Sequence, residues 1–177
     1  MGKTEHPPIK KVVLDAGPII HLDELDCLDL LLDFKELLVP EAVWNEVTGH
    51  RPAAFNNPRI AFEKSFVHQK MNSQITTFCY SLDLDAGETE AIILSSSHPG
   101  LILLTDDAAA RLAASSLSIR AYGTIGVLLR AVRRQQLQPA EVIDILEELS
   151  SRSTLFIKHS LLKGIIEEVK KEYGAQG

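Results

Sequence analysis

The chain has 177 residues and a formal net charge of −6, and it is 45% hydrophobic and 24% charged. This composition predicts a soluble globular protein of one domain, and no apolar run approaches the roughly 20 residues that span a bilayer. Residues 1–11 lack the apolar stretch of a signal peptide, so we expect a cytoplasmic protein with no membrane partner. The negative charge argues against non-specific binding to nucleic acid, yet it is compatible with a nuclease that binds phosphates through a divalent metal.

The first half of the chain alternates short apolar runs with helical patterns. Val-rich KVVLD predicts a strand that ends at an acid, and leucines at helical spacing predict the first helix. A second strand ends at Pro40, which also begins the next helix. The expected order is strand, helix, strand, helix and then a stretch without a clean period, which we interpret as a loop with a further helix or strand: residues 11–15, 22–32, 36–40, 40–50 and 51–80.

The second half continues the alternation. Asp85 and Glu88 have the spacing of a capping box, which predicts the start of a helix. The expected elements are a helix, a buried strand, a helix, a short strand and three more helices: residues 86–98, 101–105, 106–116, 119–123, 124–136, 140–150 and 159–172. Short strands between helices predict an α/β fold, a three-layer α/β/α sandwich with a central, mostly parallel sheet of four or five strands. We expect a single domain over residues 1–177, with its core at about 11–135 and C-terminal helices over 139–172.

Acidic residues follow two of these strands directly. Asp15 ends the first strand, and Asp106 and Asp107 follow the strand at 101–105. The carboxyl ends of parallel strands share one edge of the sheet, where open α/β sheets bind ligands, so we expect these three carboxylates to lie close together.

Two glutamates on neighbouring helices extend the acidic group. Glu46 lies on the helix after the second strand. Glu88 and Glu90 both lie in the first turn of the next long helix, and only one of them can face the cleft because residues two apart point in different directions.

Each acid also has an ordinary structural interpretation. Taken alone, an Asp after a strand is more often a helix cap, Glu88 more often half of a capping box, and Glu46 more often a solvated helix residue. For the adjacent pair we expect Asp107 to be the ligand and Asp106 to cap the helix or to hydrogen-bond through water, because two acids turned into one cleft would repel each other.

An acidic cluster of this kind needs a cation. Carboxylates about 4 Å apart repel by ~4 kcal/mol per pair at an effective dielectric constant near 20. Oxygen ligands without His or Cys favour Mg²⁺ or Mn²⁺ over zinc. Such ions polarise a phosphoryl group and orient a water for attack. Cys27 and Cys79 have no metal-ligand spacing, and we expect them to be buried thiols.

The chain resembles the PIN-domain family of small metal-dependent ribonucleases, and in particular its prokaryotic branch of predicted nucleic-acid-binding, toxin-like proteins. The resemblance covers nearly the whole chain from residue 11 onward. It rests on five ordered blocks: VVLDAGPIIHL, VPEAVWNEV, GETEAI, LLTDDAAARLA and YGTIGVLLRA.

The resemblance implies roles for individual residues. Asp15, Glu46, Glu88 and Asp107 match the catalytic, metal-binding acids of the family, and Asp106 is a neighbour that binds metal instead or as well. Arg111 is a candidate for holding a substrate phosphate, although an ion pair with a nearby Asp is equally plausible. The family usually has a Ser, Thr or Asn two positions after the first acid, where this chain has Gly17.

The sequence thus predicts an Mg²⁺- or Mn²⁺-dependent endoribonuclease that cleaves RNA phosphodiester bonds with metal-activated water at the acidic cluster. His21 and His50 lie near the predicted cleft, but His residues at such positions are more often surface or cap residues than catalytic ones, and no general-base His is required.

The alternative is a catalytically silent module of the same fold that binds a protein partner, such as an antitoxin, or nucleic acid. We also expect a homodimer, from the resemblance and from apolar helix faces such as that of 22–32. A phosphatase of the Asp-nucleophile type is disfavoured, because Asp15-Ala16-Gly17 is not Asp-x-Asp.

Overall fold

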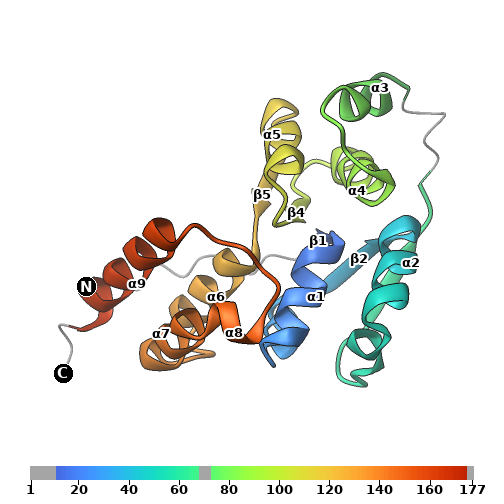
Figure 1. The fold of residues 1–177 in the computed structure, drawn as a ribbon. Coiled ribbons are helices and arrows are strands. Elements are labelled where there is room, and N and C mark those ends of the chain that lie inside the picture. The colour runs from blue at the N-terminus through green and yellow to red at the C-terminus, as the bar shows by residue number, and fades with distance from the viewer. Residues whose placement is uncertain (1–10, 68–72, 175–177) are drawn as a thin grey trace.

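A computed structural model of the protein describes residues 11–67 and 73–174. Its strands form one all-parallel, five-stranded sheet in the order β3-β2-β1-β4-β5 (Figure 1). Val13 in the central strand lies opposite Leu38 on one side and Leu103 on the other. The prediction of a mostly parallel sheet of four or five strands is confirmed. The strands are β1 (Lys11–Leu14), β2 (Glu36–Pro40), β3 (Phe62–Ser65), β4 (Ile102–Leu104) and β5 (Arg120–Tyr122).

Helices cover both faces of the sheet, which confirms the three-layer α/β/α sandwich. In Figure 1, α3, α4 and α5 lie on one side of the strands, and α1, α6 and α7 lie on the other. The helices are α1 (Ala16–Glu24), α2 (Glu41–His50), α3 (Ser73–Ser81), α4 (Ala86–Ser96), α5 (Ala108–Ser116), α6 (Thr124–Arg133), α7 (Pro139–Glu147), α8 (Leu149–Arg152) and α9 (His159–Tyr173), with 3₁₀ turns at Leu28–Asp33 and Pro52–Asn56.

The core divides between the two faces because side chains alternate along each strand. Leu14 and Leu104 belong to a cluster that packs with α1, α6 and α7. Val13 and Leu103 point the other way, into a cluster with residues of α3, α4 and α5. The short strands are therefore buried on both faces, which explains why their sequences are continuous apolar runs.

The expected helix over 22–32 is wrong in its bounds. Asp15 caps a helix that begins at once, at Ala16, and ends at Glu24. Asp26 then takes a left-handed backbone conformation (φ 57°), and the Cys27 N–H donates to Leu22 O at 2.8 Å, as in a Schellman motif. Leu22, Leu28 and Leu31, which suggested one helix, thus reach the core from a helix and a separate 3₁₀ turn.

Leu22, Leu28 and Leu31 of this stretch lie in the core, whereas Leu32 is 42% exposed. The expected homodimer stays a prediction. Cys27 and Cys79 are buried free thiols, as expected.

The stretch over 51–80 contains both a strand and a helix. β3 is the edge strand beside β2, and α3 precedes α4. Among the described residues, no helix is both long enough and apolar enough to cross a membrane.

Candidate active site

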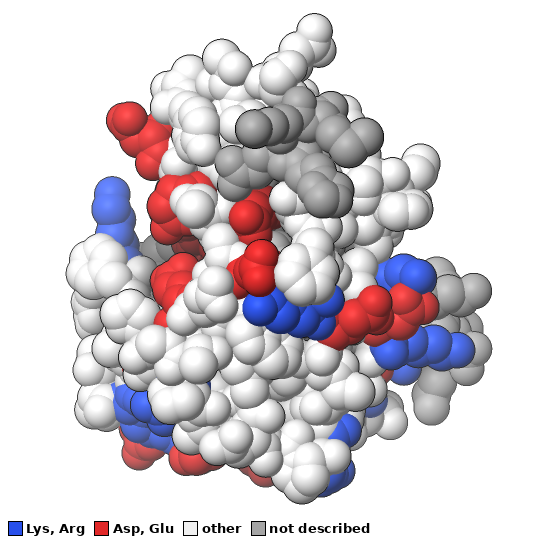
Figure 2. Space-filling model, turned by 90° about the vertical axis from the view of Figure 1, so that its right-hand side faces the viewer, with Lys and Arg blue, Asp and Glu red and all other residues white. Residues whose placement is uncertain are grey.

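A pocket of about 290 Å³ opens at the carboxyl edge of the sheet, where acidic residues from several elements meet. Six of its lining residues are Asp or Glu, and no Lys or Arg lines it in the described part of the chain. On the face drawn in Figure 2, acidic side chains gather around a hollow. We call this site the acidic pocket; its lining residues are Asp15, Ala16, Gly17, His21, Glu46, Asp85, Glu88, Asp106, Asp107, Leu155 and Phe156.

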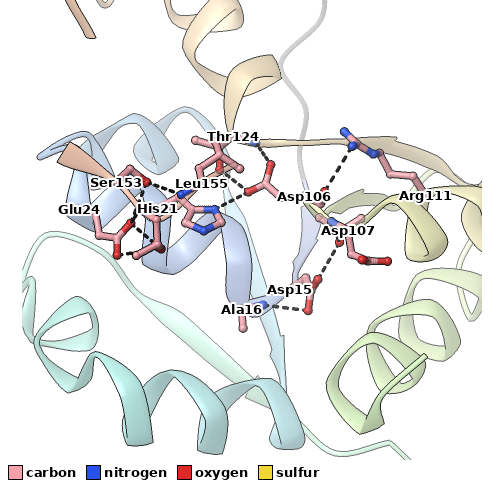
Figure 3. Close-up of polar contacts among 12 residues, drawn as sticks. Asp15, Ala16, His21, Glu24, Asp106, Asp107, Arg111, Thr124, Ser153 and Leu155 are labelled. Carbon is pink, nitrogen blue, oxygen red and sulfur yellow. Dashed lines mark hydrogen bonds and ion pairs between the residues drawn. The ribbon is translucent and has the colours of Figure 1, made fainter. Parts of the chain in front are cut away.

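Asp15 lies at the base of the acidic pocket, between the end of β1 and the start of α1. Its Oδ1 accepts from the Ala16 N–H at 2.9 Å (Figure 3). Its Oδ2 accepts from Thr105 Oγ1 at 2.7 Å. Burial raises the pKa of Asp15 from 3.8 to about 6 despite these bonds, and the charges of Asp85 and Glu46 add to the rise. The carboxylate is thus fixed in place by two hydrogen bonds.

Glu88 and Asp85 face the acidic pocket from the start of α4. Asp85 Oδ1 accepts from the Glu88 N–H at 2.8 Å, and Glu88 Oε2 accepts from the Asp85 N–H at 2.9 Å, so the predicted capping box is present. Burial raises the pKa of Glu88 to about 7, and the charges of Asp85, Asp107 and Asp15 act in the same direction.

Glu90 has a different role from Glu88, as its position two residues later predicts. Its Oε2 accepts from the Ala42 N–H at 2.9 Å, at the first turn of α2. Pro40, the N-cap residue of α2, makes no side-chain cap bond, so Glu90 supplies that bond from α4. Glu88 therefore is the one of the pair that lines the acidic pocket.

Glu46 reaches the acidic pocket from α2, and Gly87 gives it room. A Cβ at Gly87 would lie 3.4 Å from both Glu46 Oε2 and Asp85 Oδ1, so these two carboxylates approach the same point. Burial raises the pKa of Glu46, and the charge of Asp85 raises it further. Asp15, Glu46 and Glu88 thus share one electrostatic feature: each ionises less readily than usual.

Asp106 differs from these acids because it is surrounded by hydrogen-bond donors. It accepts from the Thr124 N–H at 2.7 Å, from Thr124 Oγ1 at 2.6 Å and from His21 Nδ1 at 2.9 Å (Figure 3). Burial raises its pKa, but the bonds from His21 and Thr124 outweigh burial and lower the pKa overall. Asp106 thereby joins the end of β4 to α1 and α6.

The close approach of Asp106 to α6 requires Gly123. A Cβ at Gly123 would lie only 2.5 Å from Asp106 Oδ1, which is too close for any other residue without a shift. Gly17 lies beside the same side chain, because its added Cβ would be 3.5 Å from Asp106 Oδ2 and 3.6 Å from His21 Cε1. The His21–Asp106 pair thus lies next to the position where the family usually carries a polar side chain.

The expectation that Asp106 caps the helix after β4 is wrong. Asp107, not Asp106, is the N-cap of α5, and its Oδ1 accepts from the Ala110 N–H at 2.7 Å. The reason is that Thr124 and His21, both distant in sequence, draw Asp106 towards α6 and α1. Both aspartates line the acidic pocket, so the assignment of Asp107 as a metal ligand stays a prediction.

Arg111 lies beside the acidic pocket and is not one of its lining residues. Its Nη2 donates to the Asp106 carbonyl oxygen at 3.3 Å, and its side chain is exposed. The suggested contact with a substrate phosphate stays a prediction.

Sequence reasoning missed three contributors to the acidic pocket. Asp85 is predicted only as a cap, although its place at the start of the same helix as Glu88 is a signal that it faces the same edge. His21 lines the site and bonds Asp106, where a surface or cap role is expected. The segment at Leu155 and Phe156 carries no sequence signal of its own, and only the fold brings it to this edge.

The donor chemistry of the acidic pocket fits a hard divalent cation. All six acids offer oxygen ligands, and Asp15, Glu46 and Glu88 have raised pKa values, which a cation would reverse. Within residues 11–67 and 73–174, however, no three His, Cys, Asp or Glu side chains are close enough to hold an ion as placed. Most of the six carboxylates accept hydrogen bonds from nearby N–H and O–H groups: Asp15, Asp85, Glu88, Asp106 and Asp107.

The fold and this acidic edge agree with the comparison to known families. A family model described as a PIN domain matches residues 11–171, and the chain therefore belongs to the PIN-domain family. PIN domains are generally nucleases and typically use divalent metals. No curated protein matches the chain.

Proposed function

We propose that the protein is an Mg²⁺- or Mn²⁺-dependent endoribonuclease whose active centre is the acidic pocket. The observation that carries the proposal is the set of six carboxylates at the carboxyl edge of the sheet, of which three have raised pKa values. Such a set costs stability while it is ionised and unpaired. Family membership supports a nuclease, and the oxygen-only donors support Mg²⁺ or Mn²⁺.

Asp15, Glu46, Glu88 and Asp107 would hold the cation, with Asp85 and Asp106 beside them. Bound there, the cation would supply Lewis acidity towards a phosphoryl oxygen and lower the pKa of a water. The protein's own contribution is position. Thr105 and Ala16 fix Asp15, and the capping box fixes Glu88 at the start of α4.

Asp106 contributes as a positioning residue. Its bonds to His21 and Thr124 hold α1 and α6 against the end of β4, so Asp15 and Asp107 keep a fixed separation. The lowered pKa of Asp106 keeps it ionised, and it adds negative potential beside the ligands without needing the cation itself.

A cleavage assay on defined RNAs tests the proposal. We expect the protein to cut a single-stranded oligoribonucleotide internally in Mg²⁺ or Mn²⁺ and to lose this activity in EDTA. Calorimetric titration with each ion should show binding to the wild-type chain and loss of binding in Asp15→Asn. Ion binding without any RNA cleavage would refute the ribonuclease and leave only a metal-binding fold.

The alternative is a catalytically silent module that binds a protein partner or nucleic acid. Two observations favour it: Gly17 replaces the polar residue usual in the family, and within the described ranges the acids do not converge on one point. Partner or RNA binding that is unchanged by EDTA and occurs without turnover would decide for this module. Whether a partner such as an antitoxin exists, and whether the protein belongs to the toxin-like branch, are parts of this same proposal.

A further inference from the structure

An exposed aromatic side chain lies at the rim of the acidic pocket. Phe156 lines the pocket and is 85% exposed, more than any other large apolar side chain in the described part of the chain. A single exposed apolar side chain is common on protein surfaces, so exposure alone assigns no role to Phe156. Its place in the lining of the acidic pocket is the observation that points to contact with a bound molecule.

The segment that carries Phe156 is held firmly. Glu24, at the end of α1, accepts from Ser153 Oγ at 2.7 Å and from the Thr154 N–H at 2.8 Å. In Figure 3, Ser153 and Leu155 lie beside His21, which points towards Asp106. The segment is thus tied to the same helix whose start forms the base of the acidic pocket.

Burial alternates along this segment. Leu155 is buried in the core, and Ile157 packs against the same core cluster. Phe156, between them, is turned away from the core and towards solvent. The ring is presented by a fixed backbone rather than by a loose loop tip.

The charge of the acidic pocket restricts what such a ring can bind. No Lys or Arg lines the pocket in the described residues, so the phosphates of a nucleic acid cannot pair with a basic side chain of the pocket lining. An aromatic ring attracts a nucleobase by stacking, which needs no positive charge. Stacking also requires an unpaired base, since the faces of paired bases are already covered in a duplex.

We propose that Phe156 is a stacking platform that holds an unpaired RNA base beside the acidic pocket and thereby selects single-stranded substrate. This inference rests on the proposed ribonuclease function and adds a substrate-positioning residue to it. A protein partner that covers Phe156 is the competing explanation, and RNA-binding measurements on Phe156 variants separate the two.

The test measures RNA binding separately from cleavage. A fluorescein-labelled single-stranded oligoadenylate is titrated in Ca²⁺, another divalent ion that oxygen ligands bind, with the otherwise wild-type chain. Binding is followed by anisotropy, and a gel confirms that the RNA stays uncut. The same background carries Phe156→Ala, Phe156→Trp or the matched control Phe66→Ala, which removes another exposed Phe (68% exposed) that does not line the pocket. A second set of oligonucleotides carries one abasic nucleotide at successive positions.

We expect Phe156→Ala to weaken binding by roughly 5- to 150-fold, the range that loss of one stacked base gives. Phe156→Trp should keep the affinity, and Phe66→Ala should change it less than about twofold. At one position the abasic nucleotide should weaken binding to the chain that retains Phe156 and have no further effect on the Phe156→Ala variant, because both changes remove the same contact.

Unchanged binding in Phe156→Ala, or equal losses in Phe66→Ala, would overturn the inference and favour a protein partner at this ring. Cleavage by the wild-type chain is measured in parallel and decides the ribonuclease proposal alone. Cleavage without dependence on Phe156 overturns only the stacking platform. Binding that depends on Phe156 without cleavage overturns only the ribonuclease.

Discussion

Replacing Asp15 with Asn should make the metal-free protein more stable at neutral pH. Asp15 is 6% exposed and its pKa is raised from 3.8 to about 6, so the folded state binds a proton there more tightly than the unfolded chain does. A shift of this size corresponds to about 3 kcal/mol, which is the cost of ionising the buried carboxylate at neutral pH. Asn has the same shape and no charge, so this cost disappears.

Part of the gain is lost again in hydrogen bonds. Asp15 accepts from both Ala16 N–H and Thr105 Oγ1, whereas the amide of Asn has a single acceptor oxygen. One such bond contributes about 1 kcal/mol. The net gain is therefore about 1 to 2 kcal/mol, or a rise of about 2 to 8 °C in Tm for a chain of this length.

The pH dependence identifies the cause. Below pH 3.8 Asp15 is protonated in the folded and the unfolded state, and the wild type carries no such cost. As pH rises through about 6 the wild type loses stability, and the difference in the free energy of unfolding in favour of Asp15→Asn grows to its full value. Urea unfolding in EDTA across this range measures the difference. Asp144→Asn, at an exposed position of α7, is the control and should change stability little.

The result that would refute this reasoning is an Asp15→Asn variant that is no more stable than the wild type at neutral pH. A gain that does not depend on pH would also contradict it, because burial of charge could not then be the source. Added Mg²⁺ should stabilise the wild type more than the variant, since only a bound cation offsets the carboxylate charge.

Three further outcomes are expected. Binding of Mg²⁺ should strengthen as pH rises through about 6 to 7 and should release protons, because Asp15 and Glu88 must ionise to bind. Calorimetry in buffers of different ionisation enthalpy measures the released protons. Binding without proton release would count against both residues as ligands. Gly123→Ala should cost about 1 to 3 kcal/mol in urea unfolding through its clash with Asp106, whereas Gly49→Ala, with nothing within 4 Å of the added Cβ, should be neutral or stabilising. Light scattering at micromolar concentration should give the mass of a homodimer, and a monomer mass would contradict that expectation.

The sheet and its acidic edge were predictable because they depend on strong local signals. Continuous apolar runs marked four strands, and parallel topology then brought Asp15 and the pair Asp106 and Asp107 to one edge. The edge strand β3 has a partly buried, polar sequence, FEKS, and carried no such signal. Its place is set by pairing with β2, which is a tertiary contact.

Other features depend on contacts between residues far apart in sequence. The end of α1 is set by a left-handed turn at Asp26, and the leucine spacing runs through that turn without a mark. Which of Asp106 and Asp107 caps α5 is decided by Thr124, 18 residues from Asp106, and by His21, 85 residues from it. The capping box accounts for Asp85 in the sequence, and only its place at the start of the same helix as Glu88 indicates its second role in the wall of the acidic pocket.

The central claim is that the acidic pocket is a metal-dependent ribonuclease centre, and the cleavage rate of a single-stranded oligoribonucleotide tests it most directly. The wild type, Asp15→Asn and the control Asp144→Asn are compared in Mg²⁺, Mn²⁺ and EDTA. We expect cleavage by the wild type and the control in either ion, none in EDTA, and a loss of at least about a hundredfold in the folded Asp15→Asn variant, because that change removes a proposed ligand. Cleavage by Asp15→Asn at the wild-type rate, or wild-type cleavage that persists in EDTA, would contradict the claim.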